Sequence, residues 1–103
     1  MQLDQATAIK HARQYAVLVA QQIKPLKIVL FGSYVKGNWN ENSDIDIAVI
    51  FSDYNNRFDR QLELMKLTRK VDTRIEPHPF KEKEFKVSNP FVREIITYGQ
   101  VIN

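Results

Sequence analysis

Two short motifs in this sequence combine residue types that suit phosphate and metal chemistry. Gly32 and Ser33 directly follow one apolar run, and after ten further residues Asp44 and Asp46 open another. A glycine lets a phosphate approach the backbone closely, and a serine hydroxyl can donate a hydrogen bond to a phosphate oxygen. Paired carboxylates are ligands for hard divalent cations such as Mg²⁺. Each motif alone is common in ordinary turns, but the joint pattern predicts a site for a nucleoside triphosphate and its metal.

Two predicted strands must position these residues. The continuous apolar run at 27–31 indicates a buried strand that ends at the glycine. In a second strand, at 44–51, alternation places Asp44 and Asp46 on the same face, with their backbones about 6.5–7 Å apart. Like charges this close repel each other, which favours a bound cation. The opposite face is predicted to be core and carries Ile45, Ile47 and Val49.

A third carboxylate is expected on a later strand, at 73–80. Pro77 and Pro79 cannot donate ladder hydrogen bonds, so this strand should lie at an edge of the sheet. We interpret Glu76 as the third acid of the site, with Asp72, which shares its face, as the alternative. The competing structural interpretation makes Glu76 a surface partner of a nearby arginine or lysine.

Periodic apolar residues predict helices before, between and after the strands. A long helix begins at Asp4, a suitable N-cap, and stops before Pro25. A second helix occupies about 57–70, and a last one begins after Asn89 and ends at Gly99. The predicted buried sides are Ile9, Ala12, Ala16, Val19 and Ile23 in the first helix, Phe58, Leu62 and Met65 in the second, and Phe91, Ile95 and Tyr98 in the last.

Composition limits the class of protein. A chain of 103 residues with 44% hydrophobic and 26% charged residues predicts one globular domain over 1–103. The absence of cysteine excludes disulfides, thiolate zinc sites and a cysteine nucleophile, and it fits the reducing cytoplasm, where we expect the protein. The N-terminus lacks the pattern of a secretory signal, and no apolar run approaches the roughly 18 residues of a membrane span. We therefore expect no membrane association.

Residues 27–51 resemble the minimal nucleotidyltransferases (MNT) of the polymerase-β superfamily. The resemblance rests on the apolar strand, on Gly32 and Ser33, on the ten-residue spacing and on Asp44 and Asp46, which match the Gly-Ser-x10-Asp-x-Asp signature of that group. It implies an α/β (α+β) fold, a small mixed β-sheet with helices packed on one face. It also implies transfer of a nucleoside monophosphate, most often AMP from ATP, to an acceptor hydroxyl, with release of pyrophosphate.

The resemblance also implies a role for each site residue. By similarity, the nucleotide-binding residues are Gly32, Ser33 and Lys36, and the catalytic residues, which bind two Mg²⁺ ions, are Asp44, Asp46 and Glu76. Two features depart from the family pattern. Lys36 stands where arginine is frequent and lacks the fork geometry of that side chain. Glu76 is one methylene longer than the aspartate that is common at the third position.

Relatives of this size are usually encoded beside a small helical HEPN-domain protein. In such toxin–antitoxin pairs the transferase modifies a tyrosine of the HEPN ribonuclease and silences it. The resemblance therefore implies an antitoxin role for this chain and a HEPN-domain partner that is both toxin and acceptor. Two alternatives stay open: an inactive module that neutralises its partner by contact, and an enzyme that extends an RNA end. The net charge of +3 suits ATP, but the lack of a basic stripe argues against nucleic acid as a substrate.

Overall fold

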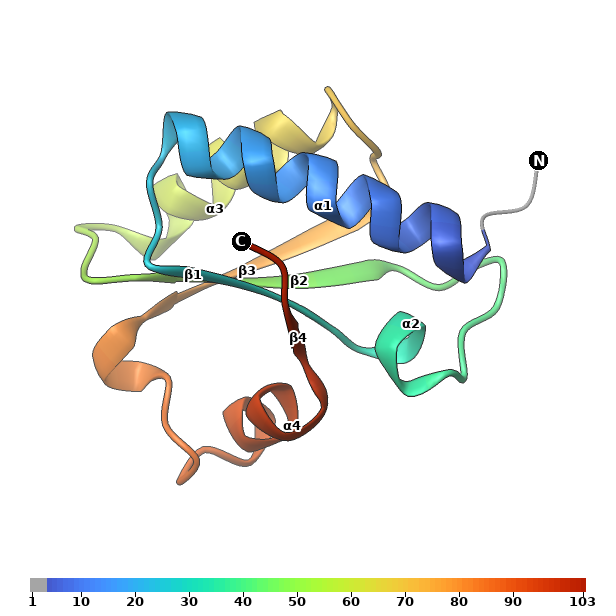
Figure 1. The fold of residues 1–103 in the computed structure, drawn as a ribbon. Helices are drawn as coiled ribbons and strands as arrows, with labels where there is room; N and C mark the ends of the chain where they lie inside the picture. Colours follow the sequence, from blue (N-terminus) through green and yellow to red (C-terminus); the bar gives the residue numbers. More distant parts are fainter. Residues whose placement is uncertain (1–3) are drawn as a thin grey trace.

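The computed structural model describes residues 4–103 and shows a four-stranded mixed sheet covered by helices (Figure 1). The strands are β1 (Lys27–Phe31), β2 (Ile45–Phe51), β3 (Ile75–Lys81) and β4 (Gln100–Val101). Their order across the sheet is β3-β2-β1-β4; β2 is parallel to β3, and β1 is antiparallel to both β2 and β4. The small mixed α/β sheet expected from the sequence is confirmed, with a short fourth strand that the sequence analysis missed.

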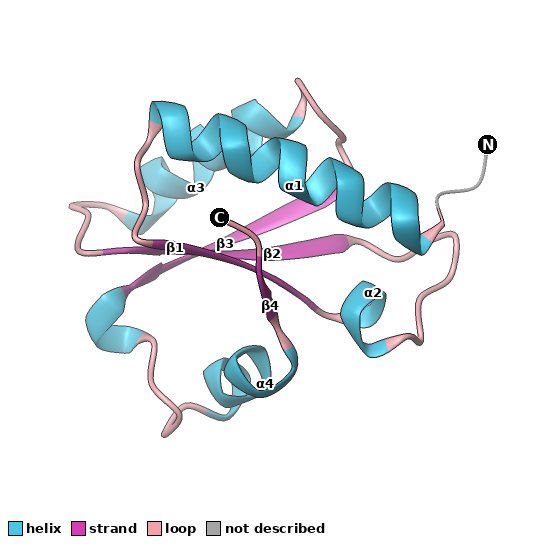
Figure 2. Cartoon of the chain, viewed as in Figure 1, coloured by secondary structure: helices cyan, strands magenta, loops and turns pink. Residues whose placement is uncertain are grey.

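The longer helices, drawn in cyan in Figure 2, each begin directly after a residue whose side chain caps the helix. The helices are α1 (Gln5–Gln22), α2 (Ser33–Lys36), α3 (Arg57–Thr68) and α4 (Pro90–Tyr98), with a 3-10 turn at Glu82–Glu84. The side chains of Asp4, Asn56 and Asn89 accept hydrogen bonds from backbone N–H groups in the first turns of α1, α3 and α4, which would otherwise lack partners. Within residues 4–103, no helix has both the length and the apolar character needed to span a bilayer.

The principal core lies between the sheet and the two long helices, α1 and α3, which lie on one face (Figure 1). β2 contributes Ile45, Ile47 and Val49, as its alternation predicted, and all three are fully buried. From α1 this core receives Ala8, Ala12, Tyr15, Ala16 and Val19. The Tyr15 hydroxyl donates a hydrogen bond of 2.7 Å to the backbone carbonyl of Leu64, which joins α1 to α3.

The last helix, α4, packs on the opposite face of the sheet, so helices cover both faces rather than one (Figure 1). A second, smaller core forms between α4 and this face. It consists of Val29, Phe31, Ala48, Ile50, Phe80, Val92 and Ile95. α4 covers this face because Ala48 and Ile50, which lie on the second face of β2, are apolar and their burial is favourable.

The predicted buried sides of the two later helices were wrong in part. In α3 the predicted side faces solvent, with Phe58 69% exposed, and Leu64 and Leu67 are buried instead. In α4, Ile95 is buried as predicted, but the other two members of the predicted stripe are about half exposed. Both helices carry apolar residues on more than one side, and periodicity alone does not identify the side that meets the sheet.

Candidate active site

Three strand ends meet at one side of the sheet and bring the two sequence motifs together. Antiparallel pairing of β1 and β2 sets Phe31 opposite Asp46, so Gly32 lies beside the start of β2. Parallel pairing of β2 and β3 sets Asp46 next to Glu76. β3 is an edge strand, as its two prolines predicted. The sheet therefore places the Gly32-Ser33 turn beside both acidic segments.

Asp46 is held between the backbone of Gly32 and the ring of His78. A Cβ added to Gly32 would overlap Oδ2 of Asp46 and lie 3.2 Å from its Cγ, so a side chain at this position would displace the carboxylate. Gly32 also has a φ of +87°, which L residues rarely adopt. On the other side, Oδ1 of Asp46 is 3.2 Å from Nε2 of His78. Asp46 therefore has a defined orientation, and its side chain is still 25% exposed.

The carboxyl groups of Glu76 and Asp44 interact at the exposed side of the same cluster. A bond between two carboxyl groups requires that one of them carries a proton. This bond is the main reason why the pKa of Glu76 is raised above its ordinary value; partial burial raises it further, and the nearby His78 opposes the shift. The contact with Asp44 and the partial burial thus both favour the protonated form of Glu76.

His78 is the member of the cluster that the sequence analysis did not assign. Carboxylate oxygens of Asp46 and Glu76 and a ring nitrogen of His78 all lie within 4.8 Å of one another, which is close enough for a shared metal ion. His78 follows Glu76 by two residues on β3, and alternation along a strand places both on one face. That spacing was the available signal, although a histidine on a strand does not by itself indicate chemistry.

Asp72, the alternative third acid, makes other contacts, in the turn before β3. Its Oδ2 is 2.7 Å from Nδ1 of His11 on α1, and its Oδ1 accepts a hydrogen bond of 2.8 Å from the backbone N–H of Arg74. Both oxygens are therefore engaged in contacts that tie the turn to α1. Register places Glu76, and not Asp72, beside Asp46. The role of either acid stays a prediction until the variants are assayed.

Ser33 and Lys36 lie on α2, the short helix that follows Gly32. Ser33 is its first residue and is half-buried. Nζ of Lys36 is 2.6 Å from Oε1 of Glu94 and 5.3 Å from the centre of the Tyr98 ring. The hydrogen bond with Glu94 raises the pKa of Lys36. This lysine therefore joins α2 to α4, a contact that the sequence did not indicate.

A pocket of about 200 Å³ opens on the α4 side of Gly32. Its lining consists of Phe31, Gly32, Phe91, Glu94 and Ile95. Pockets that bind small molecules commonly combine aromatic and aliphatic walls with a few polar groups. The pocket thus combines largely apolar walls with one carboxylate, next to the Gly32-Ser33 turn.

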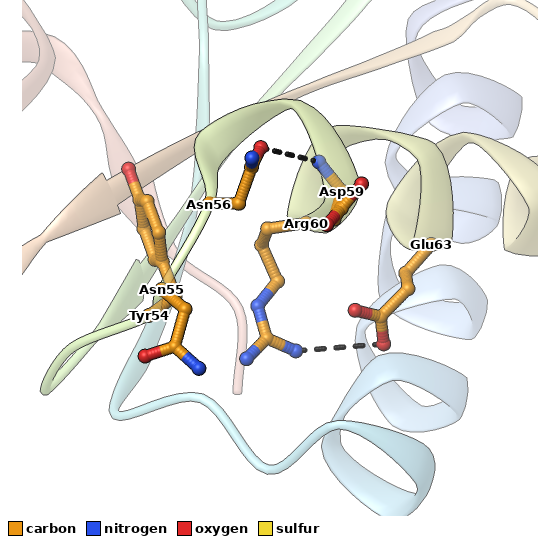
Figure 3. Close-up of a pocket in the computed structure, with 6 residues that line it drawn as sticks. All are labelled: Tyr54, Asn55, Asn56, Asp59, Arg60 and Glu63. Atoms are coloured by element: carbon orange, nitrogen blue, oxygen red, sulfur yellow. Dashed lines mark hydrogen bonds and ion pairs between the residues drawn. The ribbon is translucent and has the colours of Figure 1, made fainter.

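The pocket drawn in Figure 3 lies beyond the far end of β2 and is separate from the carboxylate cluster. There the Arg60 guanidinium lies 3.5 Å from Oε2 of Glu63 and covers the ring of Phe51 at 4.5 Å. Asn56 accepts a hydrogen bond from the backbone N–H of Asp59 and so caps α3. These polar groups serve local structure, and we place the candidate site at the carboxylate cluster.

The donor set of the cluster fits a divalent cation. Carboxylate oxygens are the preferred protein ligands of Mg²⁺, and imidazole nitrogen extends the range to transition metals. Ionisation of Asp44, Asp46 and Glu76 together would place three negative charges in one small volume. Repulsion from Asp44 and Asp46 adds to the hydrogen bond and the partial burial that raise the pKa of Glu76, and a bound cation would relieve that repulsion.

Comparison with known sequences supports a nucleotide-dependent activity. The sequence profile of the family described as "Polymerase beta, Nucleotidyltransferase" matches residues 14–103. Two proteins of Methanocaldococcus jannaschii that are named as protein adenylyltransferases are also similar. One is 38% identical over 60 residues, which cover 57% of this chain and 60% of that protein. The other is 32% identical over 76 residues, which cover 71% of this chain and 74% of that protein. The match thus spans about three fifths of the first relative.

Solved structures share the fold. A structure described as a nucleotidyltransferase of Sulfolobus solfataricus superposes with a TM-score of 0.67 at 23% identity, over 94% of this chain and 80% of that one. A toxin–antitoxin structure with AMP-PNP gives a TM-score of 0.65 at 26% identity, over 88% and 72% of the two chains. A mutant of the toxin–antitoxin pair MntA-HpeT gives 0.62 at 28% identity, over 85% and 68%.

Proposed function

This chain belongs to the polymerase beta nucleotidyltransferase family, and from that premise we propose that it transfers AMP from ATP to a hydroxyl group of a partner protein. The observation that carries the proposal is that the sheet register places Asp46 beside Glu76 and next to the Gly32 turn. The names of the two archaeal relatives support a protein acceptor. The AMP-PNP in a similar toxin–antitoxin structure supports a nucleoside triphosphate as the donor.

The turn after β1 would bind the triphosphate. Backbone N–H groups at the start of α2 and the Ser33 hydroxyl are hydrogen-bond donors, and Gly32 leaves room for phosphate oxygens. Lys36 would neutralise charge on the departing pyrophosphate, for which it must first leave Glu94. The pocket between Gly32 and α4 would receive the nucleoside.

Asp44, Asp46 and Glu76 are the residues that would hold two Mg²⁺ ions. When bound, Mg²⁺ supplies neutralisation of the charge that develops on the phosphate oxygens. In the reaction, the acceptor oxygen bonds to the α-phosphorus while the bond from that phosphorus to the β-bridging oxygen breaks. Pyrophosphate leaves with the electron pair, and we assign Glu76 as the group that receives the acceptor's proton.

We further propose that residues 1–103 act as one minimal domain, in the cytoplasm, as the antitoxin of a HEPN/MNT pair. The acceptor would be a tyrosine of a HEPN-domain toxin. Similarity to two toxin–antitoxin structures at 26% and 28% identity supports a toxin partner. The lack of cysteine fits a reducing compartment.

The test combines the purified chain, MgCl₂, ATP labelled at the α-phosphate and the purified candidate HEPN protein. We expect the label on the partner, and peptide mass spectrometry should find the mass of AMP on a tyrosine. The variant with Asp44→Asn and Asp46→Asn should transfer no label while it unfolds at a temperature close to that of the wild type. Transfer that survives this double change would contradict the proposal.

Two single variants separate the candidate third acids. Glu76→Gln should lose transfer, because Glu76 lies beside Asp46. Asp72→Asn is the matched control and should keep transfer, because both Asp72 oxygens contact other groups. The reverse result would move the third acid to Asp72.

Neutralisation of the partner by contact alone is the second candidate function. It is favoured by three exposed apolar side chains on α4, namely Phe91 at 47%, Ile96 at 46% and Tyr98 at 56%. In that case the double asparagine variant would silence the partner as well as the wild type does, and calorimetry would show no binding of AMP-PNP with Mg²⁺. Label on RNA instead of protein would indicate an RNA-extending enzyme.

A further inference from the structure

His78 has no role in the function proposed above, although it lies within the carboxylate cluster. Its side chain is 23% exposed, and its ring lies close to two phenylalanine rings, with centre-to-centre distances of 5.2 Å to Phe31 and 6.1 Å to Phe91. Phe31 belongs to β1 and Phe91 to α4, so two separate elements contact the imidazole. These contacts limit the directions in which the ring nitrogens can point.

The nitrogen Nε2 of this ring points at Asp46. The distance from Nε2 to Oδ1 of Asp46 is 3.2 Å. An ionised carboxylate can only accept a hydrogen bond, so Nε2 must be the protonated nitrogen of the ring. The second oxygen of Asp46, Oδ2, lies against the backbone of Gly32, where no side chain fits. Asp46 is thus confined at both oxygens, by Gly32 in the turn after β1 and by His78 on β3.

We propose that His78 is a positioning residue of the nucleotidyltransferase site, whose Nε2–H fixes the Asp46 carboxylate in the orientation that binds the divalent cation. This inference rests on the proposed function, because that function supplies the cation. Hydrogen bonds that orient metal ligands from outside account typically for 10–100-fold in metal affinity. The two phenylalanine rings hold the imidazole before the cation arrives, so little side-chain entropy is lost on binding.

The test is a titration of the purified chain with Mn²⁺ alone, followed by electron paramagnetic resonance, which needs neither substrate nor partner. His78→Gln should bind Mn²⁺ as the wild type does, because the glutamine amide nitrogen reaches the place of Nε2. His78→Leu and His78→Asn should bind about 10-fold or more weakly, since leucine has no donor and asparagine is too short. Rescue by glutamine but not by asparagine is not expected of a residue that merely fills space.

Each of the other outcomes would overturn the inference, and together they distinguish failure of the positioning role from failure of the proposed function. Equal Mn²⁺ affinity of the wild type and all three His78 variants would reject positioning and leave the proposed function standing. No Mn²⁺ binding by the wild type above the level of Asp46→Asn would reject both. A nitrogen hyperfine coupling that disappears in His78→Gln would make the imidazole a direct ligand and also reject positioning. If His78→Leu does not fold, the comparison of His78→Gln with His78→Asn decides the matter.

Discussion

Along β2, alternate residues enter two environments that differ in what they contribute. On the α1 and α3 face, Ile45, Ile47 and Val49 are fully buried in the larger core. On the α4 face the strand starts with Asp46, whose side chain is 25% exposed, and continues with the buried Ala48 and Ile50. One face is therefore apolar along its whole length, whereas the other is polar at one end and apolar at the other.

The difference shows how a small domain accommodates a charged site. The larger core stabilises the sheet, so the first residues of the second face need not be buried to maintain the fold. α4 closes the apolar end of that face and leaves the carboxylates accessible from solvent. Clustered carboxylates oppose folding when they are ionised without a cation, and the larger core offsets that cost.

Substitution of neighbouring residues on the two faces should give opposite phenotypes. Ile47→Ala removes a fully buried side chain and should lower the free energy of unfolding by about 2–5 kcal/mol, measured by urea denaturation. Its Mn²⁺ affinity, measured below the unfolding temperature, should stay near that of the wild type. Asp46→Asn, one position earlier, should change stability by less than about 1 kcal/mol but lose Mn²⁺ binding. Loss of metal binding in both variants would mean that the faces are not independent.

The glycines that flank α2 provide a second comparison. Gly32 and Gly37 have φ angles of +87° and +88°, so alanine at either position should cost about 1–2 kcal/mol in backbone strain. A Cβ at Gly37 would meet nothing within 4 Å, whereas one at Gly32 would displace Asp46. Gly32→Ala should therefore weaken Mn²⁺ binding as well as the fold, and Gly37→Ala should weaken the fold alone. Equal metal affinities would show that Asp46 can move aside without loss.

The difference between the faces was partly predictable from sequence. Alternation in β2 correctly separated its acidic residues from its core residues, and the caps Asp4 and Asn89 correctly marked the starts of α1 and α4. The buried side of α3 was not predictable, because Leu64 and Leu67 compete with another apolar stripe that includes Phe58. That choice depends on what the helix meets, which is a property of the tertiary structure.

The candidate site was predictable as a motif but not as a geometry. Local spacing brought out Gly32 and Asp46, which are close in sequence. The proximity of Glu76 depends on parallel pairing with β2 in a particular register, which follows from packing between segments 30 residues apart in the numbering, at 46 and 76. Contacts between α4 and other elements also could not be predicted from the sequence, and so the ion pair of Lys36 with Glu94 was not expected.

The pair of Lys36 and Glu94 tests whether α4 serves the site or only covers the sheet. Their side chains are 37% and 53% exposed, so Lys36→Met or Glu94→Gln should each reduce stability by about 0.2–1 kcal/mol at most. If Lys36 binds the triphosphate, Lys36→Met should weaken AMP-PNP binding in calorimetry. Glu94→Gln should not weaken it, because it frees the lysine. Equal AMP-PNP affinities in the wild type and Lys36→Met would assign Lys36 to the α2–α4 contact.

The smallest expected effect is on the pH dependence of stability, and it arises from the proton on Glu76. It is measured in protein kept free of metal with EDTA. The raised pKa of Glu76 means that the folded protein retains a proton at pH values at which the unfolded chain, with the ordinary value of 4.5, has lost it. The stability that this group contributes is therefore fully present below about pH 4.5 and is lost as the pH rises through the folded-state pKa. Thermal unfolding of the wild type should show this decline, and Glu76→Gln, which cannot ionise, should lack it.

Two controls decide whether the decline belongs to the carboxylate cluster. Asp72→Asn removes an acid that contacts His11 and Arg74 instead, and it should keep the decline attributed to Glu76. Addition of Mg²⁺ should abolish the decline in the wild type, because a cation stabilises the ionised carboxylates. If Glu76→Gln declines as steeply as the wild type, the bond between Glu76 and Asp44 does not form in solution. The solvent-exposed end of the α4 face would then lack the repulsion between carboxylates that distinguishes it from the apolar α1 and α3 face.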